Sequence, residues 1–198
     1  STLFPYTTLF RSIIDAEQTR ALGARLAALL RPGDLVMLSG ELGAGKTTLA
    51  QGVGAAMKVR GRVSSPTFII ARTHRATGDG PDLIHVDAYR LGSLEEIDAL
   101  DLESSMDSSV TLVEWGRGKV ESLAADRLEI EVSRPRGALA APTVIAPKAD
   151  TAKDAATAQD APAAADTDLA GIDDGHRVIT IRALGARWAG VDLGVVRP

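Results

Sequence analysis

The chain has 198 residues and a mass of 20.7 kDa, which suits one domain or one domain with a tail. Apolar residues make up 45% of it, and no run approaches the roughly 18 consecutive apolar residues that span a bilayer. We therefore expect a soluble, cytoplasmic protein without membrane contact. The lack of cysteine excludes disulfides and cysteine-based metal sites, and the net charge of −4 gives no footprint for direct nucleic-acid binding.

Two segments differ from the rest of the chain in composition, and the first is residues 1–12. They hold two of the three phenylalanines and one of the two tyrosines. They resemble translated adapter sequence joined to a truncated reading frame, so we expect an artefactual or disordered tail, with a genuine edge strand as the alternative. A signal peptide fits less well, because no basic start precedes an apolar stretch.

The second unusual segment spans residues 138–176. Between Ala146 and Ala170 it has eleven alanines, five aspartates and no aromatic residue. Such a composition buries too little apolar surface to offset the entropy of ordering the chain. We therefore predict a disordered insertion in a hairpin loop, between a domain over residues 13–137 and C-terminal strands over residues 177–198 that complete the same domain.

Apolar periodicity predicts alternating helices and strands in the remainder. Asp15 begins a helix, because Gln18 completes a capping-box pattern ahead of a leucine stripe. A second helix is expected over residues 46–57, and another capping box joins Ser93 to Glu96. Strands are expected at residues 35–38, 67–71, 83–87, 110–114, 127–132 and 177–182. We therefore predict an α/β fold of the P-loop NTPase type, with three layers and a mostly parallel central sheet joined by antiparallel strands toward the C-terminus.

Residues 40–47 read Gly-Glu-Leu-Gly-Ala-Gly-Lys-Thr and match the P-loop motif G-x-x-x-x-G-K-[ST] at every fixed position. The motif follows a predicted strand and precedes a predicted helix, as a P-loop requires. Its glycines let the backbone approach phosphate oxygens, while main-chain N–H groups and the helix N-terminus face the anion. Lys46 adds positive charge toward the β- and γ-phosphates, Thr47 is the expected hydroxyl ligand of Mg²⁺, and Thr48 supports the phosphates.

Two carboxylates end apolar strands and are candidates for the metal side of the site. Asp87 ends the strand at residues 83–87, and Glu114 ends the strand at residues 110–114. Because a parallel sheet gathers its active site at the carboxyl ends of its strands, we expect the two acids near the P-loop. Either could hold the water shell of the metal, and the sequence leaves open which of them positions the attacking water. An ordinary strand-terminal carboxylate is the alternative for each.

Other residues near this edge have two interpretations each. His85 lies on the same strand face as Asp87, which allows a metal pair, although a histidine hydrogen-bonded beside the site is the more common arrangement. Arg90 could steady phosphate charge or be an ordinary surface arginine. The hydroxyls at residues 64–67 could sense a γ-phosphate or belong to a plain proline turn. Because the chain has no asparagine, a guanine-reading N-K-x-D motif is excluded and ATP is favoured over GTP.

In this order the motifs resemble those of the TsaE family, small bacterial ATPases of the pathway that makes threonylcarbamoyladenosine in tRNA. The resemblance covers about residues 13–132. Four segments carry it: GELGAGKTT at residues 40–48, SPT at 65–67, HVDAYR at 85–90 and VEW at 113–115. It implies an ATPase that acts on the transferase subunit TsaD and its partner TsaB, and that meets tRNA only indirectly.

The resemblance also implies residue roles and the ligands ATP and Mg²⁺. Asp87 is the best candidate for catalysis, assisted by Lys46 and Glu114, and Trp115 lies near the nucleotide. The metal residues are Thr47 and Glu114. The expected nucleotide-binding residues are Glu41, Leu42, Gly43, Ala44, Gly45, Lys46, Thr47, Thr48 and Trp115.

Two other functions remain possible for a P-loop chain of this size. A small-molecule kinase needs a basic lid over its acceptor, but residues 91–107 contain six acids and no lysine or arginine. A nucleotide-sensing interaction module, in which turnover is incidental, is the non-enzymatic alternative. For an ATPase we expect low activity from the isolated chain, because the sequence shows no certain arginine finger.

Overall fold

The computed structural model describes residues 7–65, 70–98, 100–134 and 176–196. Its strands are β1 (Thr7–Ile13), β2 (Leu35–Ser39), β3 (Ala71–His74), β4 (Asp82–Asp87), β5 (Ser109–Glu114), β6 (Arg127–Ser133) and β7 (Arg177–Leu184). Its α-helices are α1 (Ala16–Ala27), α2 (Lys46–Ala56), α3 (Leu94–Asp98) and α4 (Glu103–Met106), and its 3₁₀ helices are η1 (Glu121–Leu123), η2 (Ala186–Trp188) and η3 (Leu193–Val196).

All seven strands form one sheet in the order β1-β7-β6-β2-β5-β4-β3. The four central strands β6, β2, β5 and β4 run parallel, whereas β3 at one edge and β7 and β1 at the other pair antiparallel. The predicted α/β class with a mostly parallel centre and antiparallel C-terminal strands is confirmed. The hairpin expected between the strands at residues 127–132 and 177–182 is the β6–β7 pair.

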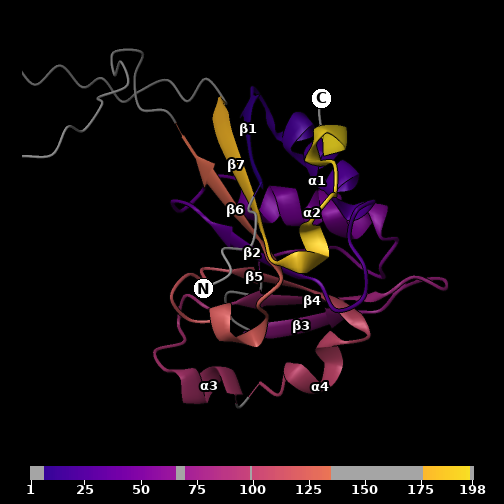
Figure 1. Ribbon diagram of the computed structural model, residues 1–198, viewed down its shortest axis with the longest axis vertical. Helices are drawn as coiled ribbons and strands as arrows, with labels where there is room; N and C mark the ends of the chain where they lie inside the picture. Colours follow the sequence, from indigo (N-terminus) through magenta and orange to yellow (C-terminus); the bar gives the residue numbers. More distant parts are fainter. Residues whose placement is uncertain (1–6, 66–69, 99, 135–175, 197–198) are drawn as a thin grey trace, which may run out of the picture.

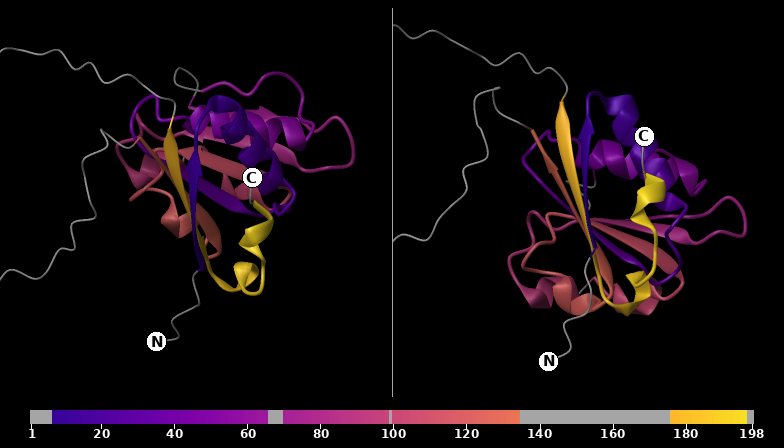
Figure 2. Two further views of the ribbon diagram at one scale, coloured as in Figure 1. Left: turned by 90° about the horizontal axis from the view of Figure 1, so that it is seen from above. Right: turned by 45° about the horizontal axis from the view of Figure 1, so that its top comes forward.

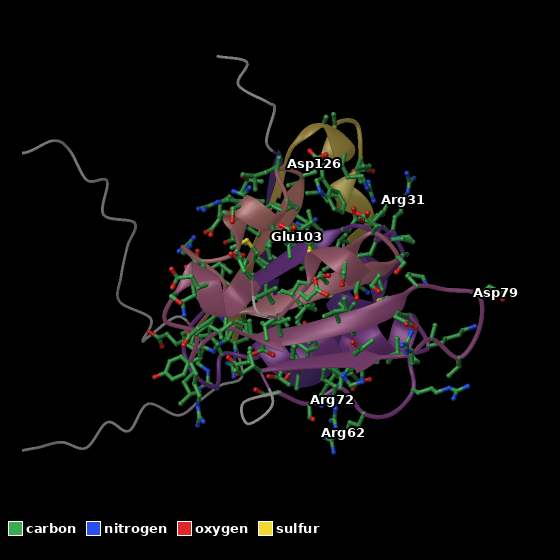
Figure 3. The ribbon with its side chains drawn as sticks, turned by 90° about the horizontal axis from the view of Figure 1, so that it is seen from below. Arg31, Arg62, Arg72, Asp79, Glu103 and Asp126 are labelled. Carbon is green, nitrogen blue, oxygen red and sulfur yellow. The ribbon has the colours of Figure 1, made fainter. Side chains whose placement is uncertain are left out.

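Helices lie on both faces of the sheet and give the predicted three layers. The helices α1 and α2 cover one face, and α3 and α4 cover the other, as Figure 1 shows. Each face has its own apolar cluster: Leu38, Leu49 and Ile130 belong to the first, and Met37 and Met106 belong to the second. Figure 3 looks onto the second face, with Glu103 of α4 near its centre and Asp79 at the tip of the loop between β3 and β4.

The first helix begins and packs as its sequence predicts. The side chain of Asp15 accepts a hydrogen bond from the N–H of Gln18 at 2.7 Å, which caps one of the free N–H groups at the helix start. Further along, α1 and α2 cross at two glycines: a Cβ on Gly23 would lie 2.4 Å from the carbonyl oxygen of Leu49, and one on Gly52 would lie 2.1 Å from that of Arg20. Glycine at both positions therefore permits the close crossing that seats α2 against the sheet.

The structure corrects the expected boundary at the N-terminus. Residues 7–12, which the composition places in a tail outside the fold, form most of β1, and this strand pairs along its whole length with β7. These residues form an edge strand, because their backbone groups complete a ladder with β7, whereas residues 1–6 lie outside the described residues. Residues 67–69 of the strand expected at residues 67–71 lie outside the described residues, and β3 begins at Ala71.

The predicted insertion at residues 138–176 lies outside the described residues except for His176. After β7 the chain returns along the α1 face through η2 and η3, seen in yellow beside α1 in Figure 2. Arg187 of η2 donates hydrogen bonds to both carboxylate oxygens of Asp34, at 3.0 and 2.9 Å, and so ties this return to the start of β2. Within the described ranges, no helix has both the length and the apolar character needed to cross a membrane.

Candidate nucleotide site

The P-loop packs against the end of β6, and this close contact requires glycine. Gly40 has φ +137°, and a Cβ there would lie only 2.1 Å from the carbonyl oxygen of Val132. Gly45, at the N-cap position of α2, has φ +113°, a backbone conformation that L side chains rarely adopt. The fixed glycines of the motif thus let the loop contact the sheet and connect it to α2. The N-terminus of α2 then faces a cleft at the end of the sheet.

Lys46 lies at the base of this loop and is 5% exposed. Its Nζ donates hydrogen bonds to the carbonyl oxygens of Gly40 and Glu41, both at 2.9 Å, and lies 4.0 Å from the ring centroid of Trp115. Burial lowers the pKa of Lys46 from 10.5, while the charges of Glu114 and Asp87 oppose this change. The cation is therefore held near two carboxylates in a largely dry position.

The two candidate acids end neighbouring strands at paired positions. Asp87 and Glu114 face each other in the parallel register of β4 and β5, as predicted from their places at the ends of apolar runs. Glu114 is 2% exposed, and its Oε1 accepts a hydrogen bond from Thr47 Oγ1 at 3.1 Å. The predicted metal residues Thr47 and Glu114 are thus in direct contact.

His85 supports Glu114 rather than forming a metal pair with Asp87. The His85 side chain is fully buried, and its Nε2 lies 2.9 Å from Glu114 Oε1. This contact matches the second interpretation given by the sequence, a histidine hydrogen-bonded beside the site. Among the described residues there is no group of three or more His, Cys, Asp or Glu side chains that could hold a metal ion by themselves. A bound metal would therefore need oxygens from its substrate or from water.

Asp87 points both carboxylate oxygens at partners from the loops beside it. Oδ1 accepts a hydrogen bond from the N–H of Tyr89 at 2.9 Å, and Oδ2 accepts one from Ser65 Oγ at 3.4 Å. The carboxylate is 6% exposed and also lines the cleft. The orientation of the carboxylate is consequently held from two sides.

Trp115 follows β5 directly and turns the chain with φ +61°, a rare conformation for a bulky residue. Its N–H donates to the carbonyl oxygen of Leu38 at 3.0 Å, which anchors this turn to the end of β2. The indole meets Tyr89 edge to face, with ring centroids 5.3 Å apart. The two aromatic rings form one wall of the site, and Tyr89 is 64% exposed.

These groups surround a cleft of about 510 Å³, a size that suits a small-molecule ligand. Its lining residues are Leu42, Gly43, Gly45, Lys46, Thr47, Thr48, Ser65, Asp87, Tyr89, Glu114 and Trp115. A second cleft of about 380 Å³ shares Gly43, Gly45 and Thr48 with the first. It continues past the P-loop to the start of α1 and to Arg177.

Most of the site residues expected from the sequence are brought together here, and a few are not. The Glu41 side chain is exposed, and only its carbonyl oxygen contacts the site, by accepting a hydrogen bond from Lys46. Ala44 is fully buried and does not line the cleft. Arg90 is exposed and does not line either cleft. Residues 66–67 of the SPT segment lie outside the described residues, so only Ser65 of that segment is placed.

Three contacts of the site were not predicted. Tyr89 belongs to the HVDAYR segment, but its packing on Trp115 arises only from the turn after β4. Arg134 and Arg177 reach the P-loop from the ends of β6 and β7, about 90 and 130 residues away in sequence. No local pattern marks such contacts, because they arise only when the antiparallel edge of the sheet is assembled beside the loop.

The donor set fits magnesium and a phosphate chain. Mg²⁺ takes oxygen ligands and keeps several waters, and the cleft offers the hydroxyl of Thr47 with the carboxylates of Glu114 and Asp87. The helix N-terminus at Gly45 and the ammonium of Lys46 are suited to the negative charge of phosphate. The residues present thus match both ligands in charge and in atom type.

Comparison with known proteins agrees with these features. A family model described as threonylcarbamoyl adenosine biosynthesis protein TsaE matches residues 13–138. The tRNA threonylcarbamoyladenosine biosynthesis protein TsaE of Streptomyces coelicolor is 49% identical over 178 residues, which cover 89% of this chain and 98% of that relative. The protein of the same name from Bacillus subtilis is 38% identical over 122 residues, covering 61% of this chain and 75% of that relative.

A solved structure extends the agreement to the fold. The crystal structure of Bacillus subtilis YdiB superposes with a TM-score of 0.60 and 25% sequence identity, covering 93% of this chain and 91% of that one. The family match includes the P-loop, both strand-end acids and Trp115. This chain therefore belongs to the TsaE family.

Proposed function

We propose that this chain binds and hydrolyses Mg²⁺-ATP as a component of the machinery that makes threonylcarbamoyladenosine in tRNA, and that it acts on TsaD- and TsaB-type subunits. The observation that carries the proposal is the contact of Thr47 with Glu114 beside a buried P-loop lysine. The names of the relatives supply the pathway, because they are tRNA threonylcarbamoyladenosine biosynthesis proteins.

The proposed chemistry divides the site into a binding part and a reacting part. The P-loop N–H groups and Lys46 bind the phosphate chain, and Thr47 and Glu114 hold the metal, which supplies charge neutralisation at the phosphate oxygens. His85 keeps Glu114 in place through its 2.9 Å contact. Asp87 orients the attacking water, since its carboxylate is held by Tyr89 and Ser65 and still lines the cleft.

The nucleoside has a separate place in this proposal. The second cleft shares the P-loop glycines and extends away from the acids, so a nucleotide with its phosphates over Gly45 can reach it. Thr19 offers a polar group there, and Ile14 offers apolar surface. ATP is favoured over GTP because the chain has no asparagine for the N-K-x-D motif that reads guanine.

The test is phosphate release from ATP by the full chain, with and without the TsaD and TsaB subunits. We expect slow release that requires Mg²⁺, rises when the two subunits are added, and falls by about 10²–10³ in Lys46→Ala, since an electrostatic group at the transferring phosphate is removed. Lys58→Ala is the matched control, because Lys58 is exposed at the far end of α2. Equal release by the Lys46→Ala protein would overturn the proposal.

One observation favours a second candidate, a nucleotide-sensing interaction module. Leu42 and Tyr89 line the cleft and are 88% and 64% exposed, so the mouth of the site carries apolar surface suited to a protein partner. Under this function, the affinity for the TsaD–TsaB pair would depend on the bound nucleotide and would be unchanged in Asp87→Asn. Under the ATPase function, Asp87→Asn would remove turnover and its stimulation by the pair.

A further inference from the structure

Two arginines from the antiparallel edge of the sheet hold the backbone of the P-loop. Ser133 pairs with Val178, so Arg134 and Arg177 occupy the next facing positions, at the end of the β6–β7 hairpin where the connecting segment leaves and returns. Arg134 Nη2 donates a hydrogen bond to the carbonyl oxygen of Gly43. Arg177 Nε donates one to the carbonyl oxygen of Ala44 at 2.9 Å. Consecutive peptide groups of the loop are thus bound by cations from outside it.

The geometry of the peptide group turns these contacts into a constraint on the anion site. The described residues contain no cis peptide bond, so each carbonyl points away from the N–H of the residue that follows it. Binding the carbonyl of Ala44 to Arg177 therefore fixes the direction of the Gly45 N–H on the opposite side. Gly45 lines both clefts, and it is the N-cap of α2, where N–H groups bind anions.

The loop needs such a constraint because of its composition. Gly43 and Gly45 have φ of +72° and +113°, and glycine has more accessible backbone conformations than any other residue. Within the loop, the N–H of Ala44 donates to the carbonyl oxygen of Glu41 at 3.1 Å, which fixes one peptide but leaves the next one to other contacts. A hydrogen bond from a charged donor is the stronger kind, so an arginine is well suited to hold it.

We propose that Arg177 is a positioning residue that holds the peptide between Ala44 and Gly45 in the orientation that binds phosphate, and that Arg134 supports it by holding the preceding peptide. The proposal rests on the proposed function, because the anion is taken to be the phosphate chain of the nucleotide. Neither arginine is assigned to the reacting atoms, because each meets the P-loop at a carbonyl oxygen, on the side of the peptide opposite to the N–H. The β6–β7 hairpin is thereby coupled to the nucleotide site.

The first experiment measures the loop without any nucleotide. We would record amide NMR spectra and hydrogen exchange for Arg177→Met, Arg177→Lys and the control Arg182→Met, which removes an exposed arginine from the same strand. In Arg177→Met we expect shifted Ala44 and Gly45 amide signals and about tenfold faster exchange there, because local opening becomes easier. Lysine can still donate to the carbonyl and should restore part of the effect.

The second experiment measures binding of ADP and of inorganic tripolyphosphate by calorimetry. We expect Arg177→Met to bind both about tenfold more weakly, the loss equivalent to one hydrogen bond, and Arg182→Met to bind within about twofold of the unchanged protein. Arg134→Met should act in the same direction and allows the test if Arg177→Met fails to fold.

The outcomes separate this proposal from the proposed function. Weaker binding with unchanged amide signals would mean that Arg177 contacts the phosphate itself, and unchanged binding with unchanged signals would mean that it has no role; either result overturns the positioning proposal. If the amide signals shift in Arg177→Met but the protein without this substitution binds no nucleotide, the proposed function is overturned and the backbone role of Arg177 still holds.

Discussion

The strands β2, β4 and β5 differ from the β6–β7 hairpin in how they are buried and in what they contribute to the site. Each of the three strands is buried along most of its length, whereas β6 alternates between buried and half-buried residues. The strands β4 and β5 are covered on both faces, and each ends in a carboxylate, Asp87 and Glu114, at the edge where the cleft lies. The hairpin contributes to the site from outside, through Arg134 and Arg177.

The difference in burial between these strands is tested most directly by truncating neighbouring side chains in β2 and β7. Met37 and Leu38 lie on opposite faces of β2 and are both buried, so Met37→Ala and Leu38→Ala should each cost about 2–5 kcal/mol in the free energy of unfolding. In β7, Ile181→Ala should cost as much, but Thr180→Ala only about 0.5 kcal/mol, because Thr180 is half-buried and lies on the opposite face of the strand from Ile181. Urea unfolding followed by circular dichroism measures all four, and a tolerated Met37→Ala would refute the difference between the strands.

The two ends of one central strand give the next test. Asp87→Asn should lower kcat for ATP hydrolysis by about 10²–10³, because a water-orienting carboxylate at the carboxyl end of β4 is lost. Asp82 begins the same strand and pairs with Arg75 at 2.8 Å, away from the cleft, so Asp82→Asn should leave kcat within about twofold. Steady-state phosphate release with excess Mg²⁺ measures both. Equal losses in the two proteins would show that β4 matters for stability and not for catalysis.

The fold could be predicted where local patterns agree with the final packing. The continuous apolar run in β2 and the alternation in β6 and β7 fixed the strand types, and the Asp15 cap located the start of α1. The composition of residues 1–12 pointed away from β1, since its pairing depends on β7, which lies far along the chain. Edge strands are often recognisable only from their partners, and this one was misassigned for that reason.

The site could be predicted to the level of its motifs. The P-loop spacing and the strand-end acids placed Lys46, Thr47 and Glu114 in one cleft, because parallel strands bring their carboxyl ends together. The sequence left the role of His85 open, since its position two residues before Asp87 fixes a strand face but not a partner. The contact with Glu114 depends on the register of β4 against β5, which no local pattern specifies.

A pair of glycines tests how closely the P-loop must approach the edge. Gly40 and Gly33 both have positive φ, but a Cβ on Gly40 would clash with Val132 whereas one on Gly33 would meet nothing within 4 Å. Gly33→Ala should therefore cost about 1 kcal/mol from backbone strain alone, and Gly40→Ala about 2–3 kcal/mol. Thermal unfolding measures the difference. Equal costs would mean that the loop can move away from β6 freely.

The smallest effect concerns the other edge of the sheet, where β3 ends in the buried His74. Burial lowers the pKa of His74 below 6.5, opposed by its contact with the carbonyl oxygen of Arg60 and reinforced by the nearby His85 and Arg72. Because the unfolded chain then binds the proton more readily, the stability contributed by neutral His74 is fully present above pH 6.5. It is lost as the pH falls through the lowered pKa of His74 in the folded protein. Between pH 7.5 and 5.5 we expect the Tm to drop by about 1–3 °C more than in His74→Gln, which cannot titrate there. A drop of the same size in both proteins would assign the pH dependence to other groups and leave this edge without a titrating contribution.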